Sequence, residues 1–271
     1  MSERQPQILD IEQVIKAKAG KKAKRIPKFL IRWFKKFVHI DFINEFLKEG
    51  YVGVEFCENA IKYLGVELVV NGLENLPKDG RRYTFVSNHP LGAIDGVTLG
   101  AIIGREYDGK VKYLMNDLLM NLKGMAPLGI PINKLGGQAR NLPKLINEAY
   151  ESENQMLVFP AGLCSRKIDG KIQDIEWGKS FVKKSRDTGR DIVPIHFDGE
   201  NSKRFYRIAN WQKKLGLKFN IAMMLLPDEM YKSKGRKYKV TIGKPIPISS
   251  LDKSKNDTQW AQEIRKKVYE L

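Results

Sequence analysis

Short apolar, β-prone runs alternate with helical patterns along most of this sequence. The strand-like runs cover residues 66–70, 83–86, 110–115, 130–133, 155–159, 191–197 and 238–242. The helical patterns cover residues 53–63, 97–103, 116–122, 139–151, 177–186, 202–215 and 259–269. Strands that alternate with helices are typical of layered α/β domains. The sequence therefore predicts an α/β fold.

The net positive charge of the chain indicates an anionic binding partner. Its 48 basic and 31 acidic residues leave a net charge of +17, which indicates nucleic acid, an anionic membrane surface or an acidic carrier protein. Two cysteines give no disulfide framework, so a reducing compartment is expected. The sequence contains no secretory signal and no apolar run of about 20 residues. We therefore expect a cytoplasmic protein that does not cross a membrane.

The first 50 residues carry a distinct basic pattern. A short helix is predicted over residues 8–18, and ten Lys or Arg residues with no acid lie between positions 16 and 36. Over residues 26–47, apolar side chains including Phe29, Trp33 and Phe37 recur at helical spacing. A basic helix with aromatic residues on its apolar side is typical of membrane-surface helices. Residues 1–50 are thus predicted to be an amphipathic membrane-contact segment; alternatively, the aromatic face packs on the protein's own core.

The candidate catalytic residues lie in the stretch 85–96, which follows a predicted strand. His89 and Asp95 are six positions apart, so they would not share the face of a regular helix. They can meet if the Pro-Leu-Gly turn between them folds back, and Gly92 can adopt the backbone angles this requires. A carboxylate that orients a histidine favours general-base catalysis. The alternative is that His89 only hydrogen-bonds within a loop.

Four motifs occur in a fixed order and together resemble a known family. They are Ser87-Asn88-His89 with Asp95, residues 129–134, residues 159–166 followed by the Trp-Gly-Lys of 177–179, and residues 192–195. Over about residues 66–245 the chain resembles the glycerolipid acyltransferases, which acylate lysophosphatidic acid and glycerol 3-phosphate. It is most similar to a branch often labelled haemolysins, some of which acylate lyso-forms of amino-acid lipids.

The resemblance implies a mixed central sheet flanked by helices, with an acyltransferase domain over residues 51–271. It also implies that His89 is the general base and Asp95 its partner. Backbone N–H groups near Gly162 are candidate donors to the oxyanion. The residues predicted to contact substrate are Asn88, Lys134, Gly162, Ser165 and Arg166. His39 and Cys164 are expected to be structural, and His196 is assigned no role.

The motifs depart from the family pattern in ways that bear on the acceptor. The family usually places four residues between the His and the Asp, whereas this chain has five, so the loop must bulge. Where the family has Phe-Pro-Glu-Gly-Thr-Arg, this chain has Ala161, Leu163 and Cys164 in place of Glu, Thr and Arg. Lys134 stands near the position of a family Arg. These changes disfavour a phosphate-bearing acceptor, because Lys binds phosphate only as a point charge.

The predicted protein is an O-acyltransferase that sits peripherally on the inner face of the cell membrane. It would move a fatty acyl group from acyl carrier protein or acyl-CoA to the hydroxyl of a lyso-lipid, with no cofactor and no metal. Three alternatives remain open: a lysophosphatidic acid acyltransferase, a non-enzymatic basic protein that binds nucleic acid or membranes, and a membrane-disrupting toxin. No nucleic-acid partner is expected, because only the net charge would support one and the four ordered motifs do not.

Overall fold

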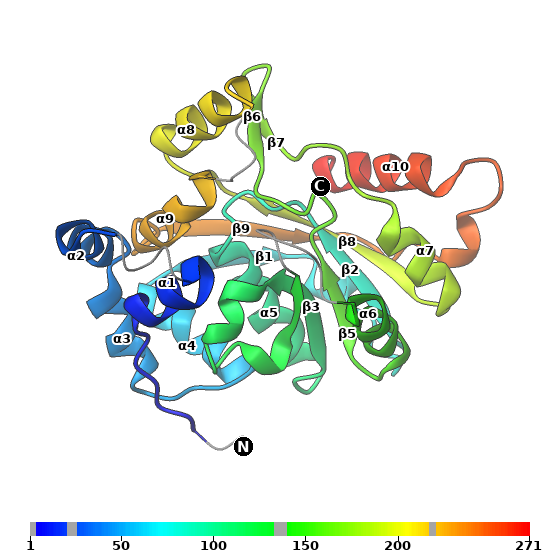
Figure 1. Cartoon of the computed structure of the whole chain (residues 1–271). Coiled ribbons are helices and arrows are strands. Elements are labelled where there is room, and N and C mark those ends of the chain that lie inside the picture. Colours follow the sequence, from blue (N-terminus) through cyan, green and yellow to red (C-terminus); the bar gives the residue numbers. More distant parts are fainter. Residues whose placement is uncertain (1–3, 21–25, 133–139, 217–220) are drawn as a thin grey trace.

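The computed structural model describes residues 4–20, 26–132, 140–216 and 221–271. Seven strands form one sheet in the order β1-β9-β8-β2-β5-β3-β4 (Figure 1). Their bounds are β1 Glu67–Asn71, β2 Tyr83–Ser87, β3 Val111–Asn116, β4 Gly129–Ile132, β5 Gln155–Val158, β8 Asp191–Asp198 and β9 Lys237–Ile242. A separate antiparallel hairpin joins β6 (Arg166–Ile168) to β7 (Lys171–Gln173).

The central sheet is mixed, as predicted. Strands β8, β2, β5, β3 and β4 run parallel to one another, whereas β9 is antiparallel to β8 and β1 is parallel to β9. The carboxyl ends of β2, β5 and β8 therefore lie at the same edge of the sheet. Ligand and catalytic residues gather at this edge in open α/β sheets. The loop that carries His89 leaves β2 there.

Helices cover both faces of the sheet (Figure 1). One face packs against α3 (Ile40–Leu47), α4 (Val54–Leu64) and α5 (Ile94–Glu106). The other packs against α6 (Leu142–Glu151), α7 (Ser180–Asp187) and α10 (Asp257–Tyr269). Because both faces are covered, every residue of β2 is buried, which explains why the central strands read as apolar runs rather than as alternating patterns.

Helix α5 contacts α4 at two of its glycines, Gly100 and Gly104. Gly96, Gly100 and Gly104 recur every four residues, which places them along one side of the helix. A Cβ atom on Gly104 would lie 2.3 Å from the side chain of Val54. A larger residue at position 104 would therefore displace Val54, where α4 begins and α5 ends. Asp95 lies in the first turn of α5.

The N-terminal segment forms more elements than the sequence pattern predicts. Helix α1 spans Ile11–Ala19, and the predicted helix over 26–47 divides into α2 (Lys28–Phe37) and α3. Between them His39 adopts a left-handed conformation with φ 54°, and its ring stacks on Tyr231 at 3.8 Å. No residue of α2 is buried, whereas Ile40, Phe46 and Leu47 of α3 are. The predicted boundary at residue 50 stays a prediction.

Helices α8 (Lys203–Lys214) and α9 (Leu226–Tyr231) lie with the β6–β7 hairpin above the carboxyl edge of the sheet (Figure 1). The sequence pattern predicted α8, over residues 202–215, but neither α9 nor the β6–β7 hairpin. The remaining elements are 3-10 turns at Leu73–Asn75, Asp117–Asn121, Ala126–Leu128, Ile221–Leu225 and Ile248–Ser250. Helix α10 begins after Asn256, whose side chain caps it by accepting from the N–H of Gln259.

A buried arginine ties the amino ends of the central strands together. The Arg190 guanidinium is fully buried and donates to the carbonyls of Tyr150 and Ser152 at 2.6–2.9 Å, at the end of α6. It also donates to Asn154, just before β5, and to Tyr83 of β2. Burial lowers the pKa of Arg190 to about 10, and the carbonyl oxygens at the helix end compensate its charge.

Replacement of Arg190 by Lys is expected to lower the free energy of unfolding by about 2 kcal/mol or more, because an ammonium group cannot reproduce the planar fork of donors. Chemical denaturation followed by circular dichroism measures this. Arg186→Lys, on an exposed turn of α7, serves as the control. Equal stability of Arg190→Lys and the wild type would contradict the role given to this side chain.

Candidate active site

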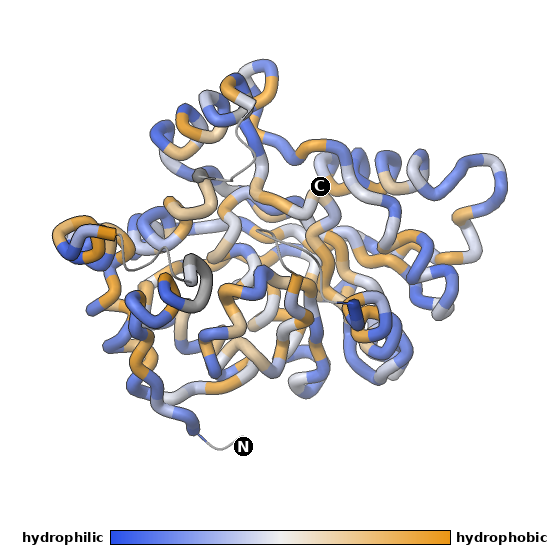
Figure 2. Tube along the Cα trace, in the orientation of Figure 1, coloured by the Kyte–Doolittle hydropathy of each residue, from blue (hydrophilic) through white to orange (hydrophobic). Residues whose placement is uncertain are grey.

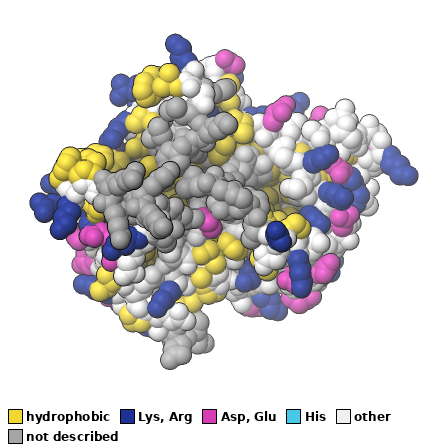
Figure 3. Space-filling model, in the orientation of Figure 1, with side chains coloured by type: hydrophobic (Ala, Val, Ile, Leu, Met, Phe, Trp, Pro, Cys, Tyr) yellow, Lys and Arg dark blue, Asp and Glu magenta, His cyan; other side chains and the backbone are white. Residues whose placement is uncertain are grey.

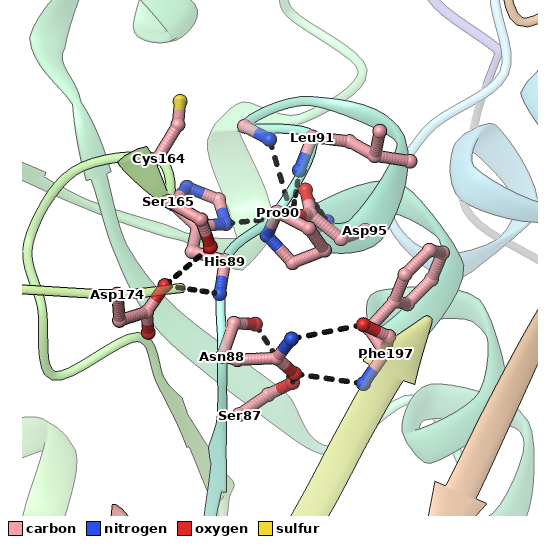
Figure 4. Close-up of polar contacts among 12 residues, drawn as sticks. Ser87, Asn88, His89, Pro90, Leu91, Asp95, Cys164, Ser165, Asp174 and Phe197 are labelled. Carbon is pink, nitrogen blue, oxygen red and sulfur yellow. Dashed lines mark hydrogen bonds and ion pairs between the residues drawn. The ribbon is translucent and has the colours of Figure 1, made fainter. Parts of the chain in front are cut away.

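The loop after β2 is attached to the neighbouring strand by an asparagine side chain. Asn88 Nδ2 donates to the carbonyl of Phe197 at 2.9 Å, and Asn88 Oδ1 accepts from the N–H of Phe197 at 2.7 Å (Figure 4). Both polar atoms of the amide thus bind the backbone of β8. The geometry gives Asn88 a positioning role, while the predicted contact with substrate stays a prediction.

His89 and Asp95 meet, as the turn between them was predicted to allow. His89 Nδ1 lies 3.0 Å from Asp95 Oδ2. The same carboxylate oxygen accepts from the N–H groups of Leu91 at 2.9 Å and Gly92 at 3.1 Å, and Asp95 Oδ1 accepts from the N–H of Gly96. Gly92 has φ +80°. The carboxylate therefore closes the turn around itself, and five intervening residues are accommodated.

The environment of Asp95 favours its charged form. Its side chain is fully buried, and burial pushes its pKa upward. The charge of His89, together with the hydrogen bonds from His89, Leu91 and Gly92, outweighs burial, so the pKa of Asp95 lies below its ordinary value. A charged, immobile carboxylate beside an imidazole stabilises the imidazolium form.

The His89 ring is mostly buried and packs against an aromatic neighbour. It stacks on Phe159, with ring centroids 4.1 Å apart, and its side chain is 16% exposed. Because Nδ1 is itself buried against Asp95, the exposure belongs to the rest of the ring. The ring is thus oriented by Phe159 on one face and by Asp95 at Nδ1.

A second buried carboxylate, Asp174, holds the backbone of His89, and the sequence motifs did not indicate it. Asp174 Oδ1 accepts from the N–H of His89 at 3.2 Å and from Ser165 Oγ at 2.6 Å (Figure 4). Asp174 Oδ2 accepts from Trp177 Nε1 at 2.9 Å. Burial raises the pKa of Asp174 against these hydrogen bonds. Asp174 thus joins the first motif to the third.

Helix α10 completes this network from far along the chain. The hydroxyl of Tyr269 accepts from the N–H of Asp174 at 2.7 Å, and Arg265 Nη2 donates to the carbonyl of Asp174 at 2.6 Å. The N–H of Ser165 in turn donates to the carbonyl of His89 at 2.8 Å. Both the N–H and the carbonyl of His89 are therefore hydrogen-bonded, which fixes the backbone that carries the imidazole.

The other residues predicted to contact substrate, where the structure describes them, are hydrogen-bonded within the protein. Ser165 is buried and engaged with Asp174. Arg166 Nη1 donates to the carbonyl of Cys164 at 2.6 Å, and the guanidinium lies over the ring of Phe205. The N–H of Gly162, a predicted oxyanion donor, donates to the carbonyl of Phe159 at 2.9 Å. Lys134 lies outside the described residues.

Residues expected to be structural occupy packing positions. Cys164 is buried, and burial raises the pKa of its thiol to about 12, which disfavours a nucleophilic thiolate. His39 Nε2 lies 3.0 Å from Asp228 Oδ1. His196 is half-buried beside Tyr269, and burial lowers its pKa.

A family model described as an acyltransferase matches residues 13–271. The chain belongs to this acyltransferase family. It is therefore an enzyme, and the alternative of a non-enzymatic protein is wrong. Within the described ranges, no helix combines the length and apolar character that crossing a bilayer requires.

Curated relatives of this acyltransferase are similar over almost their whole length. A lyso-glycine lipid O-acyltransferase of Bacteroides thetaiotaomicron is 53% identical over 266 residues, which cover 97% of each chain. One of Phocaeicola vulgatus is also 53% identical, over 97% of this chain and 95% of that protein. The resemblance found in the motifs is thus confirmed.

A solved structure has a similar fold. The 1-acyl-sn-glycerophosphate acyltransferase PlsC of Thermotoga maritima aligns with a TM-score of 0.51 over 80% of this chain and 78% of that one, at 19% identity. At this identity the likeness shows the fold alone. It confirms the mixed α/β architecture of this acyltransferase.

Replacement of Gly92 by Ala is expected to lower the free energy of unfolding by about 2–4 kcal/mol, because the residue has positive φ and lacks space. A Cβ atom on Gly92 would lie 2.2 Å from Cys164 Sγ. The double variant G92A/C164A removes the clash with Sγ but neither the 3.0 Å approach to Leu226 nor the backbone strain, so partial recovery of the melting temperature is expected. No recovery in the double variant would contradict this explanation.

Proposed function

We propose that this acyltransferase transfers a fatty acyl group from an acyl thioester to the hydroxyl of a lyso-amino-acid lipid, of the lyso-glycine class named in its relatives. The observation that carries the chemistry is the 3.0 Å contact between His89 Nδ1 and the buried Asp95 carboxylate. The identity of 53% over 97% of the chain supports the acceptor class.

In the proposed reaction His89 is the general base. Asp95 holds the proton on Nδ1, which leaves Nε2 to accept the proton of the acceptor hydroxyl. The hydroxyl oxygen then attacks the thioester carbonyl carbon, the C–S bond breaks, and the imidazolium returns the proton to the thiolate. Asp95 stabilises the imidazolium while it exists. No acyl-enzyme is required.

The charge of the chain supports the proposed donors. Acyl carrier protein and acyl-CoA are both anionic, and the net charge of +17 would attract either one. The same charge would hold the enzyme on the cytoplasmic face of an anionic membrane, where its lipid acceptor resides. Acyl carrier protein and acyl-CoA are distinguished by supplying each as the only donor.

The departures in the third motif favour a carboxylate-bearing acceptor over lysophosphatidate. Arg166 uses Nη1 for the carbonyls of Cys164 and Ser165, so its remaining N–H groups would be available to a headgroup. We propose that Arg166, with Lys134, receives the acceptor's carboxylate. Equal rates with lyso-glycine lipid and lysophosphatidate would contradict this preference.

Helix α2 is the proposed N-terminal membrane contact. Phe29 and Trp33 are exposed, at 66% and 60%. Figure 2 shows hydrophobic and hydrophilic residues interspersed along this helix, which lies at the edge of the molecule. Lys35 and Lys36 stand in its last turn. A helix of this kind lies flat in a lipid interface.

Replacement of His89 by Ala is expected to reduce acyl transfer by about a hundredfold or more, because general-base catalysis is lost. The assay supplies an acyl thioester and detergent-dispersed lyso-glycine lipid and measures the diacyl product by mass spectrometry. His89→Gln keeps a polar group beside Asp95 in case the Ala variant is unstable. His196→Gln, on the neighbouring strand, is the matched control. Full activity of a folded His89→Ala variant would refute the proposed mechanism.

The double replacement F29Q/W33Q is expected to weaken binding to anionic vesicles by about tenfold or more, since each large apolar side chain contributes over 1 kcal/mol when buried. The free energy of unfolding should change by less than about 0.5 kcal/mol, as for surface substitutions in general. Vesicle co-sedimentation and thermal denaturation measure the two effects. Unchanged vesicle binding would place the membrane contact elsewhere.

A further inference from the structure

Helix α8 carries an outward face that combines aromatic and basic side chains. Of the four tryptophans, Trp211 on α8 is 61% exposed, close to the 60% of Trp33 on α2, whereas Trp177 is buried. Leu215 follows at 52% exposure. From residue 201 to residue 227 the sequence contains six Lys or Arg and no acid. Among the residues of α8 and the turn after it whose burial is described, the exposed ones are Lys203, Arg204, Arg207, Asn210, Trp211, Lys214, Leu215 and Gly216.

The inner face of α8 is attached to the catalytic loop. Phe205, Tyr206 and Ala209 form one buried cluster with Cys164. Just before the helix, Asn201 Nδ2 donates to the carbonyls of Pro90 at 3.1 Å and Leu91 at 3.3 Å. The helix therefore cannot shift without moving the loop that carries His89.

Helices α2 and α8 are in contact through the aromatic side chain of Phe37. Phe37 of α2 packs against the α8 cluster, and the Arg204 guanidinium lies 5.3 Å from the centre of its ring. Trp33 stacks on Phe37 at 5.3 Å. Figure 3 shows hydrophobic side chains gathered over α2 and over α8, with Lys and Arg beside each group. The two exposed tryptophans thus belong to connected elements, though they are about 180 positions apart in sequence.

We propose that α8 is a second membrane-contacting element, which inserts Trp211 and Leu215 into an anionic bilayer while its Lys and Arg side chains bind lipid headgroups. This deepens the proposed function, because it brings the His89 loop to the lipid surface together with α2. Two exposed apolar side chains are too few for a stable protein interface, which buries about 800 Å² on each partner. An aromatic residue among cations suits the bilayer interface instead.

The test compares W211Q/L215Q with V69Q/L73Q in the full-length protein. Val69 and Leu73 are exposed at 38% and 43% and lie on β1 and the turn after it, so their replacement removes exposed apolar side chains from elements other than α2 and α8. Co-sedimentation with phosphatidylglycerol–phosphatidylcholine vesicles measures affinity. We expect W211Q/L215Q to bind about tenfold more weakly or worse, V69Q/L73Q to bind within about twofold of wild type, and both to keep the wild-type melting temperature.

Fluorescence supplies an independent readout. Brominated phosphatidylcholine in the same vesicles should quench tryptophan emission of a Trp33→Phe variant, and the additional change Trp211→Gln should abolish most of the quenching. Unchanged affinity and quenching in the Trp211 variants would overturn the proposal. So would a change from dimer to monomer in W211Q/L215Q with unaltered vesicle binding, which would assign this face to a second copy of the chain.

Acyl transfer to detergent-dispersed acceptor separates this inference from the proposed function. W211Q/L215Q should retain the wild-type rate there, because the catalytic pair is untouched. If the wild type transfers acyl groups in detergent but neither α2 nor α8 variants alter vesicle binding, the membrane role of α8 is wrong while the chemistry stands. If the wild type transfers none, the proposed function fails, and vesicle binding still decides the role of α8.

Discussion

The site depends on how a buried carboxylate is compensated. Asp95 is removed from water, which costs several kcal/mol for an uncompensated ion. Its compensation comes from the N–H groups of Leu91 and Gly92 and from the ring of His89. Because the donors belong to the turn itself, the carboxylate fixes the backbone that presents the imidazole. The same contacts that make Asp95 tolerable in the core orient the proposed base.

The sequence predicted most of the fold because its strands are buried on both faces and its helices have apolar sides. It failed where tertiary contacts override the local pattern. The helical spacing continues through position 39, and residues 28–47 contain no Gly or Pro. The helix nevertheless breaks there, where His39 reaches Tyr231 and Asp228. The β6–β7 hairpin was missed because its strands of three residues are largely polar.

In the site, too, local sequence patterns predict some contacts, whereas contacts between distant segments are not predicted. His89 and Asp95 lie within one motif, so their meeting could be predicted from a turn. Asp174 contacts His89 although the two residues are 85 positions apart in sequence. A pattern among neighbouring residues does not predict a contact of that kind. The basic N-terminal pattern allowed two interpretations, a membrane-contact helix or a helix packed on the protein's own core. No residue of α2 is buried, as expected of the first, whereas α3 packs in the core, as expected of the second.

The attachment of α10 to Asp174 has a consequence for how the enzyme acquires its active state. Tyr269 and Asp174 are 95 residues apart, and Asp174 and His89 are 85 apart. Contacts of such separation form late in folding, because long loops must close before they are made. Partially folded chains therefore lack an ordered His89 loop, so this site forms together with cooperative folding rather than ahead of it.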